Sequence, residues 1–168
     1  MLYVVCMDSH QEKRGRSKAF IAIVIICVTL CLGVVSVGGV FAAIAIPNYL
    51  SMQLRAKRAE VPANVSGIKT SLLAYEAGFD VHLAVEQPVP RELVALNGES
   101  VPWVSGTVFD TLGWHPGGDV RGTYWVELVG EDDFIVHGMC DMDGDGVQAH
   151  YTASRSVSAT MVTENHTY

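Results

Sequence analysis

The chain has 168 residues, of which 49% are hydrophobic and 17% are charged, and its formal net charge at neutral pH is −7. Residues 1–79 hold eight basic and four acidic side chains, a net charge of +4, whereas residues 80–168 hold three basic and fourteen acidic ones, a net charge of −11. The second part is long enough, at about 90 residues, to bury a modest hydrophobic core. Its charge argues against nucleic acid as a partner, because it offers few cations to neutralise phosphates.

The first part begins with a basic leader, residues 1–18, followed by residues 19–46, which contain no charged side chain. About 20 apolar residues can cross a bilayer as a helix, so we expect residues 19–46 to form a single transmembrane helix with the lipid bilayer as a partner. Basic flanks tend to stay in the cytoplasm, which favours a cytoplasmic N-terminus, although basic residues after the span weaken this preference. The basic residues are Lys13, Arg14, Arg16 and Lys18 before the span, and Arg55, Lys57 and Arg58 after it.

Residues 47–79 are expected to continue the helix in amphipathic form. Their apolar side chains recur at steps of three, four and seven, at Leu50, Leu54, Val61, Val65, Ile68, Leu72 and Tyr75. This spacing lines one face of a helix, the face that packs on other structure. Pro47 and Pro62 each remove a backbone donor and predict a bend, and Gly78 predicts the end of the helix.

The residues around Pro47 carry a family resemblance. Residues 39–50 read GVFAAIAIPNYL, and Gln53, Arg55 to Lys57 and Glu60 follow. Over residues 33–76 the chain resembles the type IV pilins and the pseudopilins of type II secretion. The resemblance implies an α+β fold, with a long membrane-spanning helix packed on a small antiparallel β-meander. It also implies a structural subunit that assembles with other pilin-like subunits, or with itself, into a pilus or pseudopilus-type fibre.

The same resemblance implies a single-pass protein of the bacterial inner membrane, with its C-terminal module in the periplasm or on a cell-surface fibre. Two positions depart from the family pattern: Ile25 stands where precursors carry the glycine that precedes cleavage, and Leu30 stands where they carry a glutamate. These departures favour an alternative, a membrane-anchored binding module that keeps the pilin fold but does not polymerise.

Without the glutamate, packing between helices has to rely on small side chains. Gly39 and Ala43 are four residues apart, just before Pro47, and offer a surface on which a second helix can approach closely. The competing interpretation is an ordinary single-pass anchor in which the glycines have no packing role.

Residues 80–122 are rich in proline and glycine, and we expect a connecting loop region with a short helix at 91–96 and a brief strand at 101–104. Residues 123–154 alternate between apolar and other side chains, which predicts a three-stranded antiparallel meander with one buried face. Pairing Cys140 with Val147 keeps the buried face continuous and points the Cys140 side chain inward. Residues 155–168 are expected to form a tail or an edge strand, at 156–162.

The same register places His137 opposite His150, and Trp125 opposite His137, on the outward face of the meander. Side chains that face each other across strands lie about 5 Å apart, so the three rings are expected to pack as an aromatic row. Two histidines can also bind a metal, but a zinc site needs three or four ligands and Cys140 points to the other face. We therefore favour packing over metal binding here.

The loop between the second and third predicted strands contains Asp141, Asp143 and Asp145, each separated by one residue, with glycines at 144 and 146. This arrangement is typical of calcium-binding loops, in which carboxylates and a backbone carbonyl, here that of Val147, surround a hard cation. Thr152 stands where the final glutamate of a complete loop would be. The site is therefore expected to be weak, or to be completed by water or by a carboxylate elsewhere, such as Asp132 or Asp133. The alternative is that Asp and Gly simply form a good turn.

Enzyme motifs are absent from the sequence. It contains no serine framed by glycines as in a nucleophile elbow and no glycine-rich phosphate loop, so we expect the protein not to be an enzyme. Four cysteines do not form a disulfide framework, because Cys6 lies in the leader, Cys27 and Cys31 in the span, and only Cys140 in the acidic module.

Overall fold

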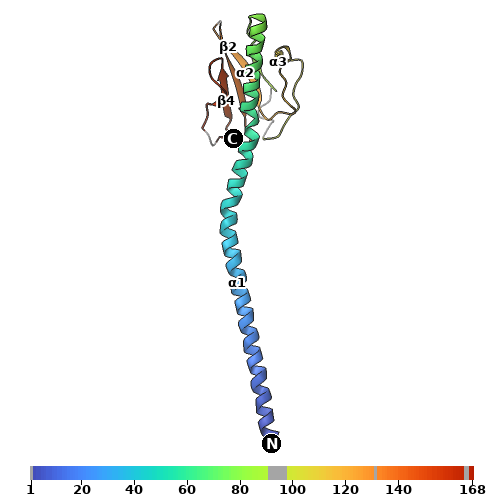
Figure 1. The fold of residues 1–168 in the computed structure, drawn as a ribbon, viewed down its shortest axis with the longest axis vertical. Coiled ribbons are helices and arrows are strands. Elements are labelled where there is room, and N and C mark those ends of the chain that lie inside the picture. Colours follow the sequence, from blue (N-terminus) through green and yellow to red (C-terminus); the bar gives the residue numbers. More distant parts are fainter. Residues whose placement is uncertain (1, 91–97, 131, 165–166) are drawn as a thin grey trace. The chain divides into compact units, whose positions relative to one another are not determined.

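The structure is a computed structural model that describes residues 2–90, 98–130, 132–164 and 167–168, and only the backbone of residues 2–19 and 37. Its architecture is α+β (Figure 1). The helices are α1 (Leu2–Arg58), α2 (Glu60–Phe79) and α3 (Val108–Thr111), and the strands are β1 (Val85–Val89), β2 (Thr123–Val129), β3 (Asp133–Cys140), β4 (Ala149–Ser154) and β5 (Thr160–Met161). Two compact units are distinguished, one ending at Tyr49 and one comprising Leu50–Tyr168.

The first unit is the greater part of α1. Its described side chains, residues 20–36 and 38–49, are all exposed. The hydroxyl of Thr29 donates to the carbonyl of Ile25 at 2.9 Å, so a polar group in this apolar stretch is satisfied within the helix itself. Helix α1 continues through Pro47 without interruption.

The helical interruption expected near Pro62 is found three residues earlier, where Ala59 alone separates α1 from α2. Pro62 itself lies in the first turn of α2, where the missing backbone donor of a proline has no helical partner to lose. The predicted end of the helix at Gly78 is wrong by one residue. Helix α2 ends at Phe79, and Asp80 adopts the left-handed conformation (φ 55°), which a short polar side chain tolerates.

The core of the second unit forms between α2 and the sheet. Four side chains of α2 are almost completely buried, and they belong to the face that the sequence predicts: Val61, Val65, Ile68 and Leu72. Helix α2 packs on β3 and β4, and its close approach depends on Gly138 of β3. A Cβ atom at Gly138 would lie 2.5 Å from Cγ2 of Val65 and 2.9 Å from Cγ1 of Val61.

The five strands are antiparallel neighbours in chain order, so the sheet is a meander of five strands and not of three. The predicted register of the second hairpin is wrong by two residues: Cys140 pairs with Ala149, not with Val147. Because the side-chain period of a strand is two, this shift leaves the same face buried. Cys140 is indeed fully buried, as expected.

The segment expected to be a loop region, residues 80–122, holds more structure than its composition indicates. Strand β1 pairs with β2 at the edge of the sheet, and the register shifts between Val85 and Val89, the stretch that contains Pro88. The strand expected at 101–104 is reduced to one bridge, between Val101 and Val120. The helix expected at 91–96 lies outside the described residues.

Three aromatic side chains from this segment complete the core. Trp103, Phe109 of α3 and Trp114 pack around Tyr124 of β2, with ring centroids between 5.3 and 6.3 Å apart. In Figure 1, α2 lies between the sheet and the segment that carries α3. The expected edge strand at 156–162 is present in shortened form, as β5.

Candidate functional site

One described helix is long and apolar enough to cross a membrane, as judged by length and composition. Its most apolar stretch has a mean hydropathy of 3.0, and none of that stretch is buried within the chain. Since burying apolar surface stabilises a protein by about 25 cal/mol per Å² removed from water, an exposed surface of this size needs lipid or protein around it.

The predicted packing surface of this helix is open. A Cβ atom built at Gly39 meets no heavy atom within 4 Å, and Ala43 and Pro47 are likewise exposed. Ser36, one turn before Gly39, keeps its hydroxyl bonded to the carbonyl of Leu32. This surface of the helix therefore carries small side chains, and the Ser36 hydroxyl is hydrogen-bonded within the helix. Among the described residues, Gly39, Ala43 and Pro47 are all exposed.

The second candidate site is the loop after β3. One carboxylate oxygen each from Asp141, Asp143 and Asp145 lies within 4.8 Å of the others, as a shared cation requires. The two oxygens of Asp141 accept hydrogen bonds from the backbone N–H groups of Gly144 (2.7 Å) and Gly146 (3.0 Å), which wrap the loop around this side chain.

Two contacts hold this loop against the rest of the second unit. Met142 points into the core and is 3% exposed, while the backbone N–H of Gly98 donates to the carbonyl of Asp141 at 2.9 Å. Gly98 has a positive φ of 73°, and a Cβ atom there would lie 2.3 Å from the carbonyl oxygen of Met142. This anchoring explains the register: the chain turns inward at Met142 and rejoins the sheet only at Ala149.

The predicted extra ligands differ in their positions. Val147 lies just after the loop, where its N–H donates to Oδ1 of Asp145 at 2.7 Å. Asp132 and Asp133 are wrong as candidates for a further ligand, because they lie at the opposite end of β3, eight residues long, from Asp141. At about 3.3 Å per residue, that strand separates the two ends by more than 20 Å.

The loop gathers negative charge, as a cation site does. Burial raises the pKa of Asp143 above its ordinary value, and the neighbouring charge of Asp145 raises it further. Such carboxylates repel one another when all are ionised, and a hard divalent cation removes this repulsion by accepting their oxygens as ligands.

The third candidate site is the outward face of the sheet, where Trp125, His137 and His150 do form an aromatic row. Trp125 faces His137 across the strands, as predicted, but His137 faces Thr152 and His150 faces Met139. The two histidines are therefore diagonal neighbours, and the predicted direct pairing is wrong by the same two-residue shift.

The two imidazoles are joined by a hydrogen bond. Nδ1 of His137 lies 3.0 Å from Nε2 of His150, and the ring centroids are 5.2 Å apart with 18° between the planes. This centroid distance is close to the nitrogen–nitrogen distance plus two ring radii, so the rings lie nearly in one plane, edge to edge. Both rings stack on the indole of Trp125, with centroids 4.6 and 5.7 Å away.

A carboxylate lies near this pair, but Nε2 of His137 is buried and has no hydrogen-bond partner among the described residues. Nε2 of His137 lies 3.5 Å from Oε2 of Glu127, which favours a proton on that nitrogen and leaves Nδ1 as the acceptor for His150. The two nitrogens point at each other at hydrogen-bond distance, which leaves no room for a metal ion between them. Burial lowers the pKa of both histidines, and for His150 the nearby His137 lowers it further.

The thiol of Cys140 is a poor nucleophile at neutral pH. Burial raises its pKa to about 12, so it is protonated at neutral pH, and only the thiolate is a good nucleophile. Cys27 and Cys31 are exposed on the apolar helix and, like Cys140, form no disulfide in the described part of the chain.

No family model, curated protein or solved structure matches the chain. The resemblance to pilins therefore depends on residues 33–76 themselves. The features that sequence reasoning missed, the His137–His150 hydrogen bond and the inward turn at Met142, depend on a register that the pattern of alternating residues does not determine.

Proposed function

We propose that the protein is a pilin-like structural subunit, held in a bacterial inner membrane by α1 and able to assemble into a type IV pilus or pseudopilus-type fibre. The observation that carries this proposal is the apolar stretch of residues 20–49, whose described side chains are all exposed. The same surface serves two states, since lipid covers it in the membrane and other α1 helices cover it in a fibre.

The soluble module supports this assignment. Residues 80–168 carry a net charge of −11. Their carboxylates are not arranged as an acid and a base on either side of a substrate cleft, and the aspartates gather on one loop instead. The proposed work of the protein is therefore physical, consisting of helix packing and the display of a surface, without turnover of a substrate.

Orientation and compartment belong to the same proposal. We place the leader, residues 1–18, in the cytoplasm and the acidic module in the periplasm, because basic flanks are retained inside. A cation in the Asp141–Asp145 loop would then come from the periplasm, and calcium is the cation whose oxygen-ligand chemistry fits the loop.

A second candidate function is a permanently anchored binding module. Ile25 and Leu30 favour it, because they replace the cleavage glycine and the intramembrane glutamate expected in a pilin. A carboxylate in hydrocarbon is costly unless it pairs with a cation, such as the terminal amine of a neighbouring subunit, so its absence removes one contact between subunits.

The two functions are separated by the N-terminal sequence and the location of the protein. Cells that produce the full chain are sheared, and the protein is isolated from the membrane and from the sheared surface material. A fibre subunit is expected in the sheared fraction, in high-molecular-weight form. A chain with all 168 residues that is found only as a monomer in the membrane would reject the fibre and support the anchored module.

A further inference from the structure

The far end of the second unit carries an acidic surface with exposed apolar side chains. Two adjoining clefts, of about 610 and 310 Å³, lie there and share Glu76 and Asp80 in their linings. Phe79 is 67% exposed, Val81 50% and Leu128 39%. We call this surface the tip, and it comprises Glu76, Phe79, Asp80, Val81, Leu128 and Asp132.

Two carboxylates of the tip form no side-chain ion pair with another described residue, although the Arg155 guanidinium in the same cleft donates to the backbone carbonyl of Asp132 at 2.9 Å. Glu76 already pairs with Arg155, whereas Asp80 and Asp132 are exposed and their side chains take part in no ion pair with the other described residues. Exposed apolar side chains beside unpaired carboxylates suit a partner that offers apolar and basic side chains together.

The other end of the same unit offers this combination. Met52, Arg55 and Lys57 are exposed on the last turns of α1, and neither Arg55 nor Lys57 is ion-paired with another residue that the structure describes. We call these three residues the collar. The two unpaired cations of the collar match the two unpaired carboxylates of the tip, and Met52 matches its apolar side chains.

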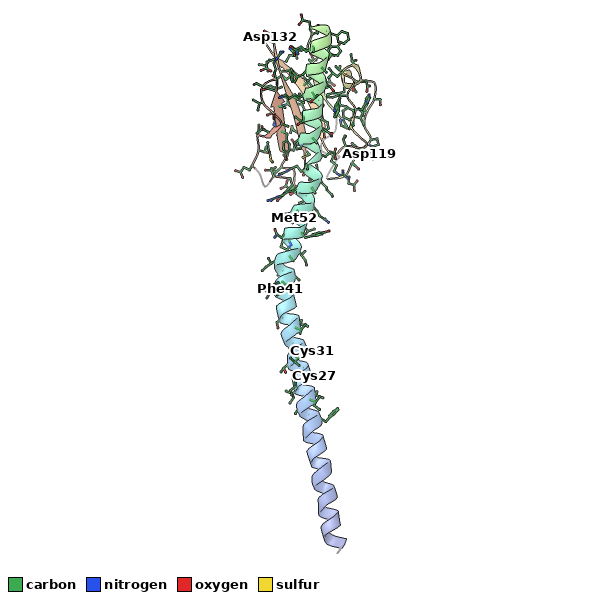
Figure 2. All side chains as sticks on the ribbon, in the orientation of Figure 1. Cys27, Cys31, Phe41, Met52, Asp119 and Asp132 are labelled. Atoms are coloured by element: carbon green, nitrogen blue, oxygen red, sulfur yellow. The ribbon has the colours of Figure 1, made fainter. Side chains whose placement is uncertain are left out.

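One chain cannot join its own collar to its own tip. Helix α2 has 20 residues and separates the two surfaces by about 30 Å, at 1.5 Å per residue. Figure 2 shows Met52 and Asp132 at opposite ends of the unit. Surfaces that are complementary but lie at opposite ends of a molecule join copies head to tail, and such contacts continue without closing.

We propose that the tip binds the collar of a second copy of this chain, with Arg55 and Lys57 on Asp80 and Asp132 and Met52 on Phe79 and Val81. The proposal rests on the proposed fibre function and adds to it a contact between the soluble modules, separate from the packing of the apolar helices.

The test is photo-crosslinking of the full chain in cells that produce it, with the membrane and the sheared surface material analysed separately. A tip and a collar about 30 Å apart along the molecule can meet only where one copy is displaced out of the bilayer. A photoreactive phenylalanine analogue replaces Val81 in one preparation and Phe41, on the apolar helix, in another. Crosslinked peptides are identified by mass spectrometry, with isotope labelling to mark bonds between copies. We expect the analogue at position 81 to capture a peptide containing residues 50–58 of a second copy.

Charge variants provide the matched comparison. Asp80→Asn with Asp132→Asn is expected to lower the crosslink yield at position 81 by about threefold to tenfold, since exposed ion pairs contribute modestly. Arg55→Gln with Lys57→Gln should lower it equally, and all four changes together should cause little further loss. Glu99→Gln with Asp119→Asn, both exposed, changes the net charge by the same amount away from the tip and should leave the yield unchanged.

Each of the other outcomes would contradict either the contact between tip and collar or the fibre itself. Capture of another region, another protein or lipid at position 81 overturns the tip–collar contact, as does a full additive loss when the two pairs of changes are combined. Capture between copies at position 41 without capture at position 81 overturns the contact but leaves the fibre intact. Failure at both positions rejects the fibre as well.

Discussion

At the scale of single residues, the pair of histidines on the outward sheet face links stability to pH. Burial lowers the pKa of both His137 and His150, so the folded state binds fewer protons than the unfolded state just below the ordinary histidine pKa of 6.5. The stability that the neutral pair contributes is therefore complete above that pH. It is lost as the pH falls through the lowered pKa values of the folded state.

We expect His150→Gln to weaken this dependence on pH. The amide of glutamine can still donate to Nδ1 of His137, but it does not titrate, so the variant should lose less thermal stability than the original chain between neutral and mildly acidic pH. The measurement is the melting temperature of the full chain in detergent across this range. His115→Gln, an exposed histidine outside the row, is the control, and an equal slope in all three proteins would contradict the assignment.

Asp143 tests the cation site. Calcium should raise the melting temperature of the full chain above its value in chelator, because the cation binds the folded loop and removes the repulsion between Asp141, Asp143 and Asp145. Asp143→Asn should abolish the rise and, in chelator, be at least as stable as the original chain.

The control for this variant is Asp119→Asn, an exposed carboxylate outside the loop that should leave the calcium response unchanged. Identical melting curves of the original chain with calcium and with chelator would mean that the aspartates serve only to form the turn.

At the scale of elements, α2 and β3 approach each other closely at Gly138. Gly138→Ala places a Cβ atom 2.5 Å from Val65, a β-branched residue on a packed helix that has little room to move. Such overpacking is expected to cost about 2 kcal/mol of the free energy of unfolding. The measurement is denaturant unfolding of the full chain in detergent.

The same substitution at Gly78 is the control, because a Cβ atom there meets no heavy atom within 4 Å and Gly78 lies within α2. Alanine is the better helix former, so Gly78→Ala should stabilise the protein by up to about 1 kcal/mol. Equal effects of the two changes would mean that the packing of α2 on β3 is looser than the structure indicates.

The elements differ in how far the sequence determines them. The buried face of α2 and the alternation in β2, β3 and β4 follow from hydrophobic period alone, so both were predictable. The register between β3 and β4 was not predictable. A shift of two residues keeps Cys140 and its partner on the buried face and changes only the length of the loop between the two strands. The inward position of Met142 decided between the two registers.

Strand β1 and the aromatic cluster were beyond prediction for different reasons. In β1, Glu86 and Pro88 are residue types that argue against a strand in the sequence. They are tolerated here because β1 lies at the edge of the sheet. Trp103, Phe109 and Trp114 are separated in sequence by turns. Both tryptophans contact Tyr124 of β2, and Phe109 packs on both tryptophans. The aspartate loop could be predicted because its three carboxylates are close in sequence.

At the scale of the whole molecule, the chain joins a helix that requires an apolar environment to a module that requires water. Charge follows the same division, with a net charge of +4 for residues 1–79 and −11 for residues 80–168. In the proposed function, a monomer satisfies both parts at a membrane surface. Outside the membrane, the apolar helix has to be covered by other helices, and close packing then depends on where small side chains lie.

Gly39 is the position at which that packing can be tested. Gly39→Leu adds a large side chain to the surface shared with Ala43, which should lower the proportion of assembled protein by about tenfold, equivalent to about 1.4 kcal/mol. Insertion into the membrane should be unchanged, because leucine is apolar. The measurement compares crosslinked oligomers and total membrane-bound protein in the same cells.

Ala45→Leu is the matched control, because at 100° per residue Ala45 lies on another side of the helix from Gly39 and Ala43. It adds similar bulk and apolar character outside the proposed packing surface, so assembly should be retained. An equal loss in both variants would mean that the helix packs through its whole circumference, and no loss in either would mean that α1 serves as an anchor in lipid and not as the core of a fibre.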